Sequence, residues 1–377
     1  MAGLYVHIPF CTQRCLYCDF YSNTNMRRKE DFCQALKREM ELRKHYLGGE
    51  PIETLYFGGG TPSQLSAETY QQLFEVLHKH YDLSACQEIT LEANPDDLTP
   101  AYIHTLRRLP INRISMGVQS FDDTDLRFLN RRHDSAQAIR AVRDCQQVGF
   151  TNLSIDLIYG LPHQTADAWA HNLDQALALD VPHLSAYHLT YEEGTALYRM
   201  WQAGKVEQAD EDLSLQLFQQ LINTLKAAGY EHYEISNFAK EGKYARHNTA
   251  YWQEKKYLGL GPSAHSFDVD SRQWNVASLK DYVEALRQGT PRVERETRTP
   301  SMRYNEYILT SLRTMWGISL QHVADTYGDT YRAHLQTQAL PFVKRGTLAQ
   351  EGDHLWLTPS KGIFVSDGIM AELMYDA

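Results

Sequence analysis

Residues 4–18 read LYVHIPFCTQRCLYC, a β-rich run followed at once by three cysteines. The run Leu4–Ile8 predicts a strand, so the cysteines lie in the loop at its carboxyl end. Thiolates are the usual ligands of iron–sulfur clusters, and four of them close a cubane. Because Cys11, Cys15 and Cys18 supply only three, the spacing predicts a 4Fe–4S cluster with one iron open to a non-protein ligand.

The three cysteines could also belong to a zinc site completed by a histidine such as His7, or they could be unconnected thiols. Zinc sites usually take their ligands from two separated pairs, and the sequence has no second pair. The pattern therefore favours the cluster. Cys33, Cys86 and Cys145 lie apart from one another, and we expect them to be structural, because a free cysteine packs as a small hydrophobic residue.

Short β-rich runs alternate with amphipathic helical stretches over the first half of the chain. Strands are expected at Leu4–Ile8, Thr54–Phe57, Glu88–Glu92, Arg113–Val118, Leu153–Ile158 and Leu184–Leu189. Thr99 and Thr165 are expected to cap helices between them. Six βα units in series predict an α/β fold, a partial parallel (β/α)6 barrel, with a doubly wound open sheet as the alternative. In either fold the chemistry lies at the carboxyl ends of the strands.

After Tyr230 the pattern becomes irregular and rich in aromatic residues, and the charged stretch PRVERETRTPS (291–301) is typical of a linker. We therefore divide the chain into residues 1–297, with an irregular extension from about 230, and residues 298–377. The second part has expected helices at Arg303–Leu312 and Leu320–Tyr327 and a hairpin at Leu348–Thr358 with its turn at Gly352. Helices followed by a hairpin predict a small winged-helix-like domain.

Composition excludes several classes of protein. The formal charge of −10 disfavours a nucleic-acid-binding protein, including a regulator that contacts DNA through the C-terminal domain. The sequence contains no run of about 18 apolar residues, so it predicts no membrane span. Its first residues do not resemble a secretory signal. Clustered cysteines fit a reducing compartment, so we expect a cytoplasmic protein.

Five further motifs extend the cysteine pattern: LYVHIPFC, FGGGTP, EANP, GVQSF and IDLIYGLP, in this order. Together with the Cys-x3-Cys-x2-Cys spacing, they resemble the radical S-adenosylmethionine (SAM) superfamily. Within it, they are similar to the branch that contains oxygen-independent coproporphyrinogen III oxidase and the HemW-like heme chaperones. The resemblance covers essentially the whole chain and implies a 4Fe–4S cluster that binds SAM at its open iron.

Residues at the ends of successive expected strands suit a SAM site. A glycine triplet lets backbone approach a ligand, Glu92 could accept from an ammonium group, and Arg131 could pair with a carboxylate. The alternative for each charged residue is an internal ion pair that supports the barrel. The resemblance implies that eight residues line the SAM site: Tyr5, Gly59, Gly60, Thr61, Glu92, Gln119, Arg131 and Asp156.

Oxidase and chaperone are separated by three features. The oxidase motif continues to a fourth cysteine where this chain has Asp19-Phe20, and the oxidase has a longer segment before its first strand. Residues 246–252, RHNTAYW, resemble the HNxxYW segment of the heme chaperones. Imidazole can ligate heme iron and flat rings can stack on the macrocycle.

The resemblance therefore implies a heme site at His247, Tyr251 and Trp252. Aromatic segments with one histidine are also typical of packed cores, and His188, His232 and His265 are alternative ligands. We expect a chaperone that binds heme and passes it to an acceptor protein, such as a membrane-associated respiratory enzyme, and that works as a homodimer. The alternative is radical oxidative decarboxylation of coproporphyrinogen III propionates, an activity we do not expect here.

Overall fold

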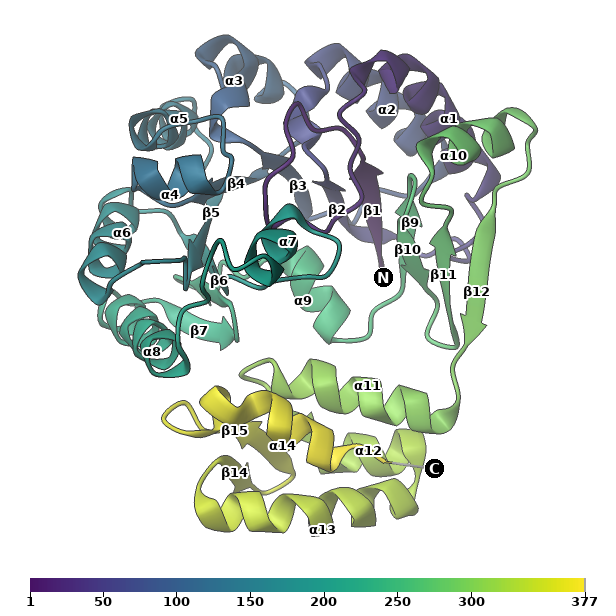
Figure 1. Ribbon diagram of the computed structural model, residues 1–377. Coiled ribbons are helices and arrows are strands. Elements are labelled where there is room, and N and C mark those ends of the chain that lie inside the picture. Colours follow the sequence, from purple (N-terminus) through teal and green to yellow (C-terminus); the bar gives the residue numbers. More distant parts are fainter. Residues whose placement is uncertain (376–377) are drawn as a thin grey trace.

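The computed structural model describes residues 1–375. Its centre is a 12-stranded sheet in which the first six strands are parallel neighbours in chain order (Figure 1). They are β1 (Ala2–Ile8), β2 (Ile52–Gly59), β3 (Glu88–Ala93), β4 (Arg113–Gln119), β5 (Asn152–Tyr159) and β6 (His183–His188). A doubly wound sheet reverses its strand order at a switch point, so this order confirms the partial barrel. The barrel is not closed.

Helices cover the outer face of these strands, as Figure 1 shows. They are α1 (Lys29–Leu42), α2 (Ala67–His80), α3 (Pro100–Leu106), α4 (Asp123–Phe128), α5 (Ser135–Gln147), α6 (Ala166–Ala178) and α8 (Glu211–Ala227), with short 3-10 turns at Met26–Arg28, Pro62–Gln64 and Pro95–Asp97. The expected caps are confirmed, because Thr99 accepts from the Tyr102 N–H and Thr165 from the Ala168 N–H. Along β1, Leu4, Val6 and Ile8 are fully buried in the main core with these helices.

The alternate residues of each strand point to the concave side, and there the sheet is polar. Thr54, Glu88, Arg113 and His183 are all buried on strands β2, β3, β4 and β6. The Glu88 carboxylate accepts backbone N–H bonds from Arg246 (3.0 Å) and His247 (2.9 Å). These two hydrogen bonds anchor α9 (Arg246–Trp252) on the concave side of the sheet, at the amino end of β3.

The region after Tyr230 is more regular than we predicted. It contains β7 (Glu231–Glu234), β8 (Asn237–Ala239), β9 (Tyr257–Leu260), β10 (His265–Phe267), β11 (Ser271–Asn275), α10 (Leu279–Arg287) and β12 (Val293–Thr297). β9 pairs parallel with β1, while β8 pairs antiparallel with β6. The stretch interpreted as a linker contains β12, which pairs with β11. Every residue of β12 is exposed, so its sequence carries no apolar alternation that could reveal a strand.

A second hydrophobic core lies in the C-terminal part and includes Tyr304, Ile308, Leu335 and Leu355. It is formed by α11 (Pro300–Leu312), β13 (Ile318–Ser319), α12 (Leu320–Tyr327), α13 (Asp329–Arg345), β14 (Leu348–Glu351), β15 (His354–Leu357) and α14 (Ser366–Leu373), with a 3-10 turn at Gly362–Val365. The expected hairpin is present. Two helices, α13 and α14, were not predicted, and α13 contains Pro341, normally a helix breaker.

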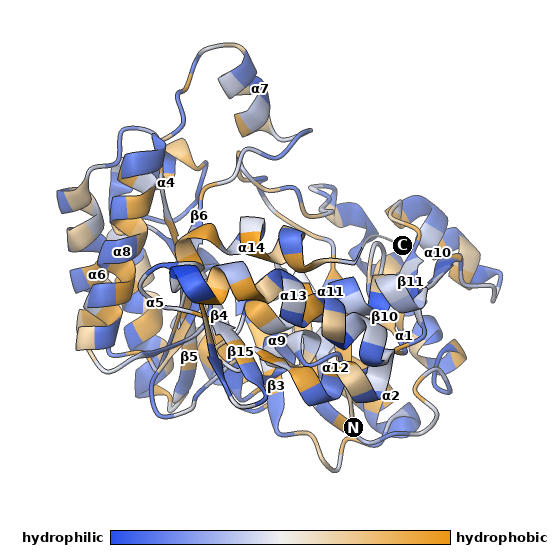
Figure 2. Cartoon of the chain, turned by 90° about the horizontal axis from the view of Figure 1, so that it is seen from below, coloured by the Kyte–Doolittle hydropathy of each residue, from blue (hydrophilic) through white to orange (hydrophobic). Residues whose placement is uncertain are grey.

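Two further features of the described residues bear on function. None of their helices is long and apolar enough to cross a membrane. Helix α7 (Ala196–Gln202) stands out from the body of the molecule in Figure 2. In Figure 1 it lies in front of the sheet, close to the cysteine loop.

Candidate cofactor site

The cysteine loop follows β1 at the carboxyl edge of the sheet. Cys11 is buried, Cys15 and Cys18 are half-buried, and none of the three forms a disulfide. The backbone of Leu16 holds the loop in place, since its N–H donates to Leu129 O (3.3 Å) and its carbonyl accepts from Leu197 of α7 (2.9 Å). The fold therefore keeps three thiols together in a loop that is covered on one side by α7.

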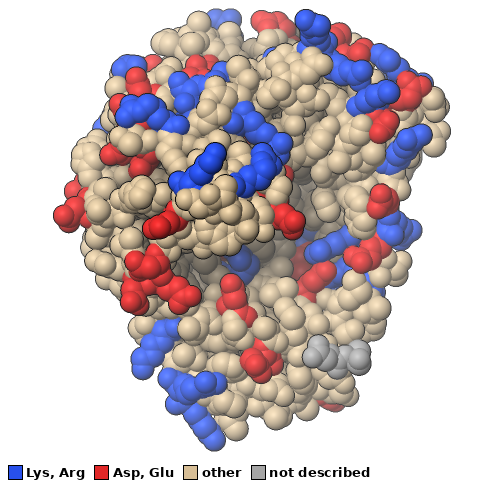
Figure 3. All heavy atoms as spheres, viewed as in Figure 1, with Lys and Arg blue, Asp and Glu red and all other residues tan. Residues whose placement is uncertain are grey.

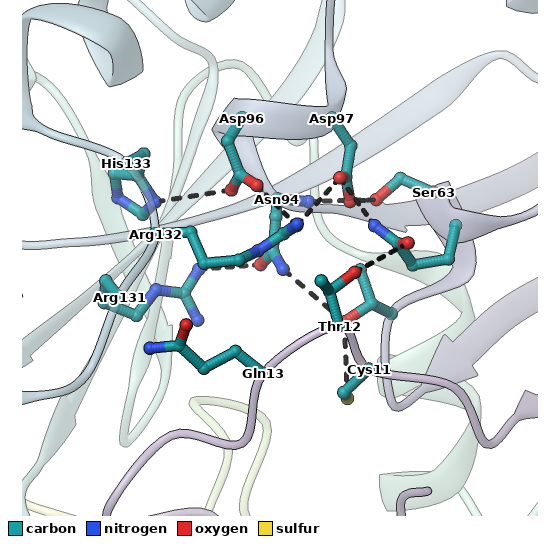
Figure 4. A network of polar contacts seen from close by, with 12 residues as sticks. Cys11, Thr12, Gln13, Ser63, Asn94, Asp96, Asp97, Arg131, Arg132 and His133 are labelled. Atoms are coloured by element: carbon teal, nitrogen blue, oxygen red, sulfur yellow. Dashed lines mark hydrogen bonds and ion pairs between the residues drawn. The ribbon is translucent and has the colours of Figure 1, made fainter. Parts of the chain in front are cut away.

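Two of the three sulfur atoms accept side-chain hydrogen bonds. Thr61 Oγ1 donates to Cys11 Sγ at 3.4 Å, and Arg131 Nη1 donates to Cys15 Sγ at 3.3 Å. Arg131 is itself fixed by the carbonyl of Gly117 (2.6 Å) and by Asn94 Oδ1 (2.7 Å). Figure 4 shows Arg131 and Asn94 side by side.

A polar network ties the same loop to two neighbouring strand ends (Figure 4). Asp97 accepts from Ser63 Oγ (2.6 Å), Gln64 Nε2 (2.6 Å) and Arg132 Nη2 (2.8 Å). Gln64 Oε1 in turn accepts from Thr12 Oγ1 at 2.8 Å. Asp97 was not predicted as a site residue, although it lies two residues after the EANP motif. The network therefore ties the cysteine loop to the ends of β2 and β3.

The geometry argues against His7 as a zinc ligand, because its Nδ1 bonds the Tyr5 hydroxyl (3.1 Å) and its Nε2 bonds Tyr21 O (2.9 Å). Burial lowers the pKa of His7 to about 4, so the ring is neutral.

The donor set fits an iron–sulfur cluster. Burial raises the pKa of the Cys11 thiol and raises that of Cys18 to about 11, so both are protonated at neutral pH unless a cation binds. The N–H and O–H donors aimed at Cys15 and Cys11 suit anionic sulfur. Iron would supply the charge that makes these buried thiols thiolates.

The glycine triplet after β2 is required by close packing. Gly59 has φ +107°, and a Cβ at this position would lie 2.6 Å from the His7 ring. A Cβ on Gly60 would lie 2.9 Å from the Phe10 carbonyl oxygen. The glycines therefore let β2 end against the start of the cysteine loop, while the Gly59 N–H donates to Glu92 Oε2 at 3.1 Å.

Glu92 and Asp156 bring two carboxyl groups to the concave face of the sheet. Burial, strengthened by the charge of Asp156, raises the pKa of Glu92 to about 7, although a 2.6 Å bond from Tyr56 opposes the shift. Burial raises the pKa of Asp156 to about 6, and Ser115 Oγ lies 3.5 Å from its carboxyl oxygens. Neither carboxyl group forms an ion pair within 4.0 Å among the described residues. The alternative, in which these residues form internal ion pairs that support the barrel, therefore does not apply to them.

Tyr5 and Gln119 complete the expected set. The Tyr5 ring stacks on Tyr56 with 6.1 Å between centroids. Gln119 has φ +70° at a bulge in the pairing of β4 with β5. Its Nε2 approaches Gly117, where the Arg131 guanidinium also lies. The eight expected residues thus lie at or near the carboxyl ends of β1 to β5, and Tyr56 and Asn94 join them from the same strands.

His247 lies on the concave side of the sheet, beside Tyr5 and Tyr56, and is 1% exposed. Its Nδ1 bonds Thr54 Oγ1 and its Nε2 bonds the Tyr251 hydroxyl, both at 2.8 Å. Burial lowers the pKa of His247 to about 3, and the ring stacks on Tyr56 at 5.0 Å. In this conformation His247 is part of the packed interior, Tyr251 is half-buried, and neither imidazole nitrogen can reach an iron.

Trp252, the last residue of α9, is half-buried, and the Arg313 guanidinium lies 5.0 Å from its ring. Of the alternative heme ligands, His188 and His265 are exposed. His232 is half-buried, bonded to Ile235 O (2.9 Å) and stacked on Phe238. The exposed imidazoles therefore lie outside the HNxxYW-like segment.

The face shown in Figure 3 is hollowed between the barrel and the C-terminal part. On the concave side of the sheet, Tyr187 of β6 is 43% exposed. A tyrosine so exposed on the inner face of a barrel indicates open space beside it. The concave face can therefore admit a ligand.

Known proteins resemble the chain over nearly its full length. Residues 5–176 match the radical SAM superfamily, and residues 299–365 match the HemN C-terminal domain. The heme chaperone HemW of Bacillus subtilis is 31% identical over 95% of both chains. HemW of Mycobacterium tuberculosis is 33% identical over 99% of this chain and 94% of its own. The solved structure of coproporphyrinogen III oxidase (HemN) from Escherichia coli superposes with a TM-score of 0.85 at 24% identity, covering 99% of this chain and 90% of that chain.

Proposed function

The chain belongs to the HemW family of the radical SAM superfamily, and we propose that it is a heme chaperone. In this proposal Cys11, Cys15 and Cys18 hold a 4Fe–4S cluster whose fourth iron binds SAM. The observation that supports the cluster is the loop of three thiols, two of which accept hydrogen bonds, from Thr61 and Arg131. Heme is the cargo, delivered to an acceptor protein.

The SAM pocket is proposed at the carboxyl ends of β1 to β5. Glu92, ionised when a cation approaches, would accept from the SAM ammonium group, and Asp156 would line the same pocket. Tyr5, Gly59, Gly60 and Gln119 would line the pocket. A cluster held by Cys11, Cys15 and Cys18 would, when reduced, be able to supply one electron to the sulfonium of bound SAM. The protein's own part is to orient the cofactor and to exclude water through α7 and the cysteine loop.

The heme site is proposed at the HNxxYW-like segment, facing the hollow of Figure 3. Trp252 offers a partly exposed ring for stacking. The Arg313 guanidinium beside it is paired with Glu234, to which its Nε (3.1 Å) and Nη2 (2.8 Å) donate. Ligation by His247 requires its bonds to Thr54 and Tyr251 to break first. Because all six cysteines are free thiols, we also propose a reducing, cytoplasmic location.

The deciding experiment is an anaerobic heme titration of the reconstituted protein and of the Cys11/Cys15/Cys18→Ala variant. We expect about one heme per chain in both, with a Soret band of ligated iron, because the proposed heme segment lies apart from the cysteine loop. Transfer is then followed to an apo heme protein. Absence of heme binding in both proteins would refute the chaperone function.

Loss of heme only in the cysteine variant would place the porphyrin in the barrel, as expected for a substrate. Homodimerisation is checked on the same samples by light scattering with and without heme. A mass of one chain under every condition would refute the dimer.

A further inference from the structure

Asn94 lies between the two side chains that donate to the cysteine sulfurs. Its Oδ1 accepts from Arg131 Nη2 at 2.7 Å, and its Nδ2 donates to Thr61 Oγ1 at 3.4 Å. One amide just after β3 therefore contacts both donors, and Figure 4 shows its contact with Arg131. Asn94 makes no contact with a cysteine itself.

Both donors are restrained so that only one group of each is directed at sulfur. Arg131 Nη2 is occupied by Asn94 and by the Gly117 carbonyl (2.6 Å), which leaves Nη1 for Cys15 Sγ. Thr61 is 5% exposed and accepts from Asn94, so its hydroxyl proton is directed at Cys11. A restrained donor keeps its hydrogen bond when the charge on the sulfur changes.

We infer that Asn94 is a positioning residue that aims Thr61 and Arg131 at the thiolates of Cys11 and Cys15, and that these two hydrogen bonds raise the reduction potential of the cluster. The inference rests on the proposed cluster. Reduction adds negative charge to a cluster and its thiolates. Hydrogen-bond donors to sulfur stabilise that charge, which shifts the potential to more positive values.

This gives Arg131 a role different from pairing with a SAM carboxylate, and the two roles are separable. A sulfur donor acts on the cluster before SAM is added, whereas a carboxylate partner acts only in its presence. The potential of the SAM-free protein is therefore the discriminating quantity.

The test is an EPR-monitored redox titration of anaerobically reconstituted protein without SAM. Thr61→Val replaces the hydroxyl group by a methyl group of similar size and should shift the midpoint potential to more negative values, while the matched control Thr61→Ser, which keeps the hydroxyl, should stay at the wild-type value. Arg131→Met should also lower the potential. Arg132→Met is the control, because it removes the same charge from a neighbouring side chain that bonds Asp97 and not sulfur. It should lower the midpoint potential less than Arg131→Met does.

Asn94→Ala tests the positioning role. It should lower the potential without removing either donor, and the Asn94→Ala/Thr61→Val double variant should shift less than the sum of the two single shifts. Additive shifts would show that Asn94 does not act through Thr61.

The possible outcomes separate this inference from the proposed function. A wild-type protein that fails to take up about four irons refutes the cluster itself. A loaded protein in which Thr61→Val and Thr61→Ser have the same potential overturns the inference alone. If the variants load poorly, pulsed EPR of the wild type after exchange into D2O decides: strongly coupled exchangeable protons near the cluster are expected, and their absence overturns the inference.

Discussion

The N–H of Gly59 donates to Glu92 Oε2 at 3.1 Å, which joins the ends of β2 and β3 at the proposed SAM pocket. Gly59 can make this bond because its φ of +107° turns the chain toward β3, a conformation that other residues rarely adopt. The Tyr56 hydroxyl donates to the other carboxyl oxygen at 2.6 Å. Glu92 is therefore held in one orientation before a ligand arrives.

The two sets of cysteines should behave differently. Alanine at Cys11, Cys15 and Cys18 should abolish cluster uptake, because these thiols share one loop. Alanine at Cys33, Cys86 and Cys145 should leave it intact, because Cys33 and Cys145 are buried in the main core and Cys86 packs against it. Iron content and visible absorption after anaerobic reconstitution measure the difference. Equal loss in the second set would contradict the assignment.

SAM affinity should depend on pH through Glu92. Its carboxyl group has a pKa of about 7, so raising the pH from 6 to 8 ionises it and should strengthen binding of the cationic ligand. Glu92→Gln should bind SAM more weakly and lose most of this dependence. Equilibrium dialysis of the reconstituted protein measures both effects. An unchanged pH dependence in Glu92→Gln would assign it to another group.

The free energy of unfolding of the cluster-free protein should fall as the pH rises from about 4 to 7. Burial raises the pKa of Glu92 from 4.5 to about 7 and that of Asp156 from 3.8 to about 6. The folded state thus binds more protons than the unfolded state between these values, so the free energy of unfolding decreases with pH. Thermal unfolding of Glu92→Gln and Asp156→Asn should show a flatter decrease between pH 4 and 7.

Heme binding should require His247 to leave its buried position. His247→Ala should shift the Soret band, because imidazole is a common ligand to heme iron. Tyr251→Phe removes one hydrogen bond that holds the ring and should speed heme association by about fivefold, for a bond of about 1 kcal/mol. Stopped-flow absorption measures the rate. If His247→Ala leaves spectrum and affinity unchanged, the ligand is an exposed imidazole, His188 or His265.

The junction with the C-terminal part should depend on Arg298. Its side chain is fully buried and pairs with Glu306 and with Glu254 at 3.3 Å. Arg298→Ala should cost about 2 kcal/mol, less than the roughly 3–5 kcal/mol of a fully buried pair, because both carboxylates are partly exposed. Arg303→Ala is the control, since its pair with exposed Asp270 should contribute less than about 1 kcal/mol. Calorimetry compares the two.

Coproporphyrinogen III oxidation should be absent. The chain has Asp19-Phe20 where the oxidase motif continues to a fourth cysteine. We therefore expect no protoporphyrinogen IX from reconstituted protein supplied with SAM and a reductant, and no rescue of a strain without coproporphyrinogen oxidase. Product detected by chromatography would favour the oxidase.

The six parallel strands and the position of the cysteine loop were predictable from sequence, whereas the strand order, which distinguishes the partial barrel from a doubly wound sheet, came from the structure. Strands β1 to β6 carry apolar runs between helical stretches, and that periodicity reports burial directly. Six consecutive βα units place Cys11, Glu92 and Asp156 at one edge of the sheet, whatever the details of packing. The cysteine spacing likewise depends on local chain geometry alone.

Tertiary structure decided what periodicity does not encode. Strand β12 is exposed throughout, so only its pairing with β11 reveals it. The buried state of His247 depends on Thr54 and Glu88, which lie more than 150 residues away in the chain. The hydrogen bonds of Asn94 to Thr61 and Arg131 likewise join the ends of β2 and β3 to the segment after α4. Hydrogen bonds between distant residues follow from how strands pack, and a linear sequence shows the donors and acceptors without their distances.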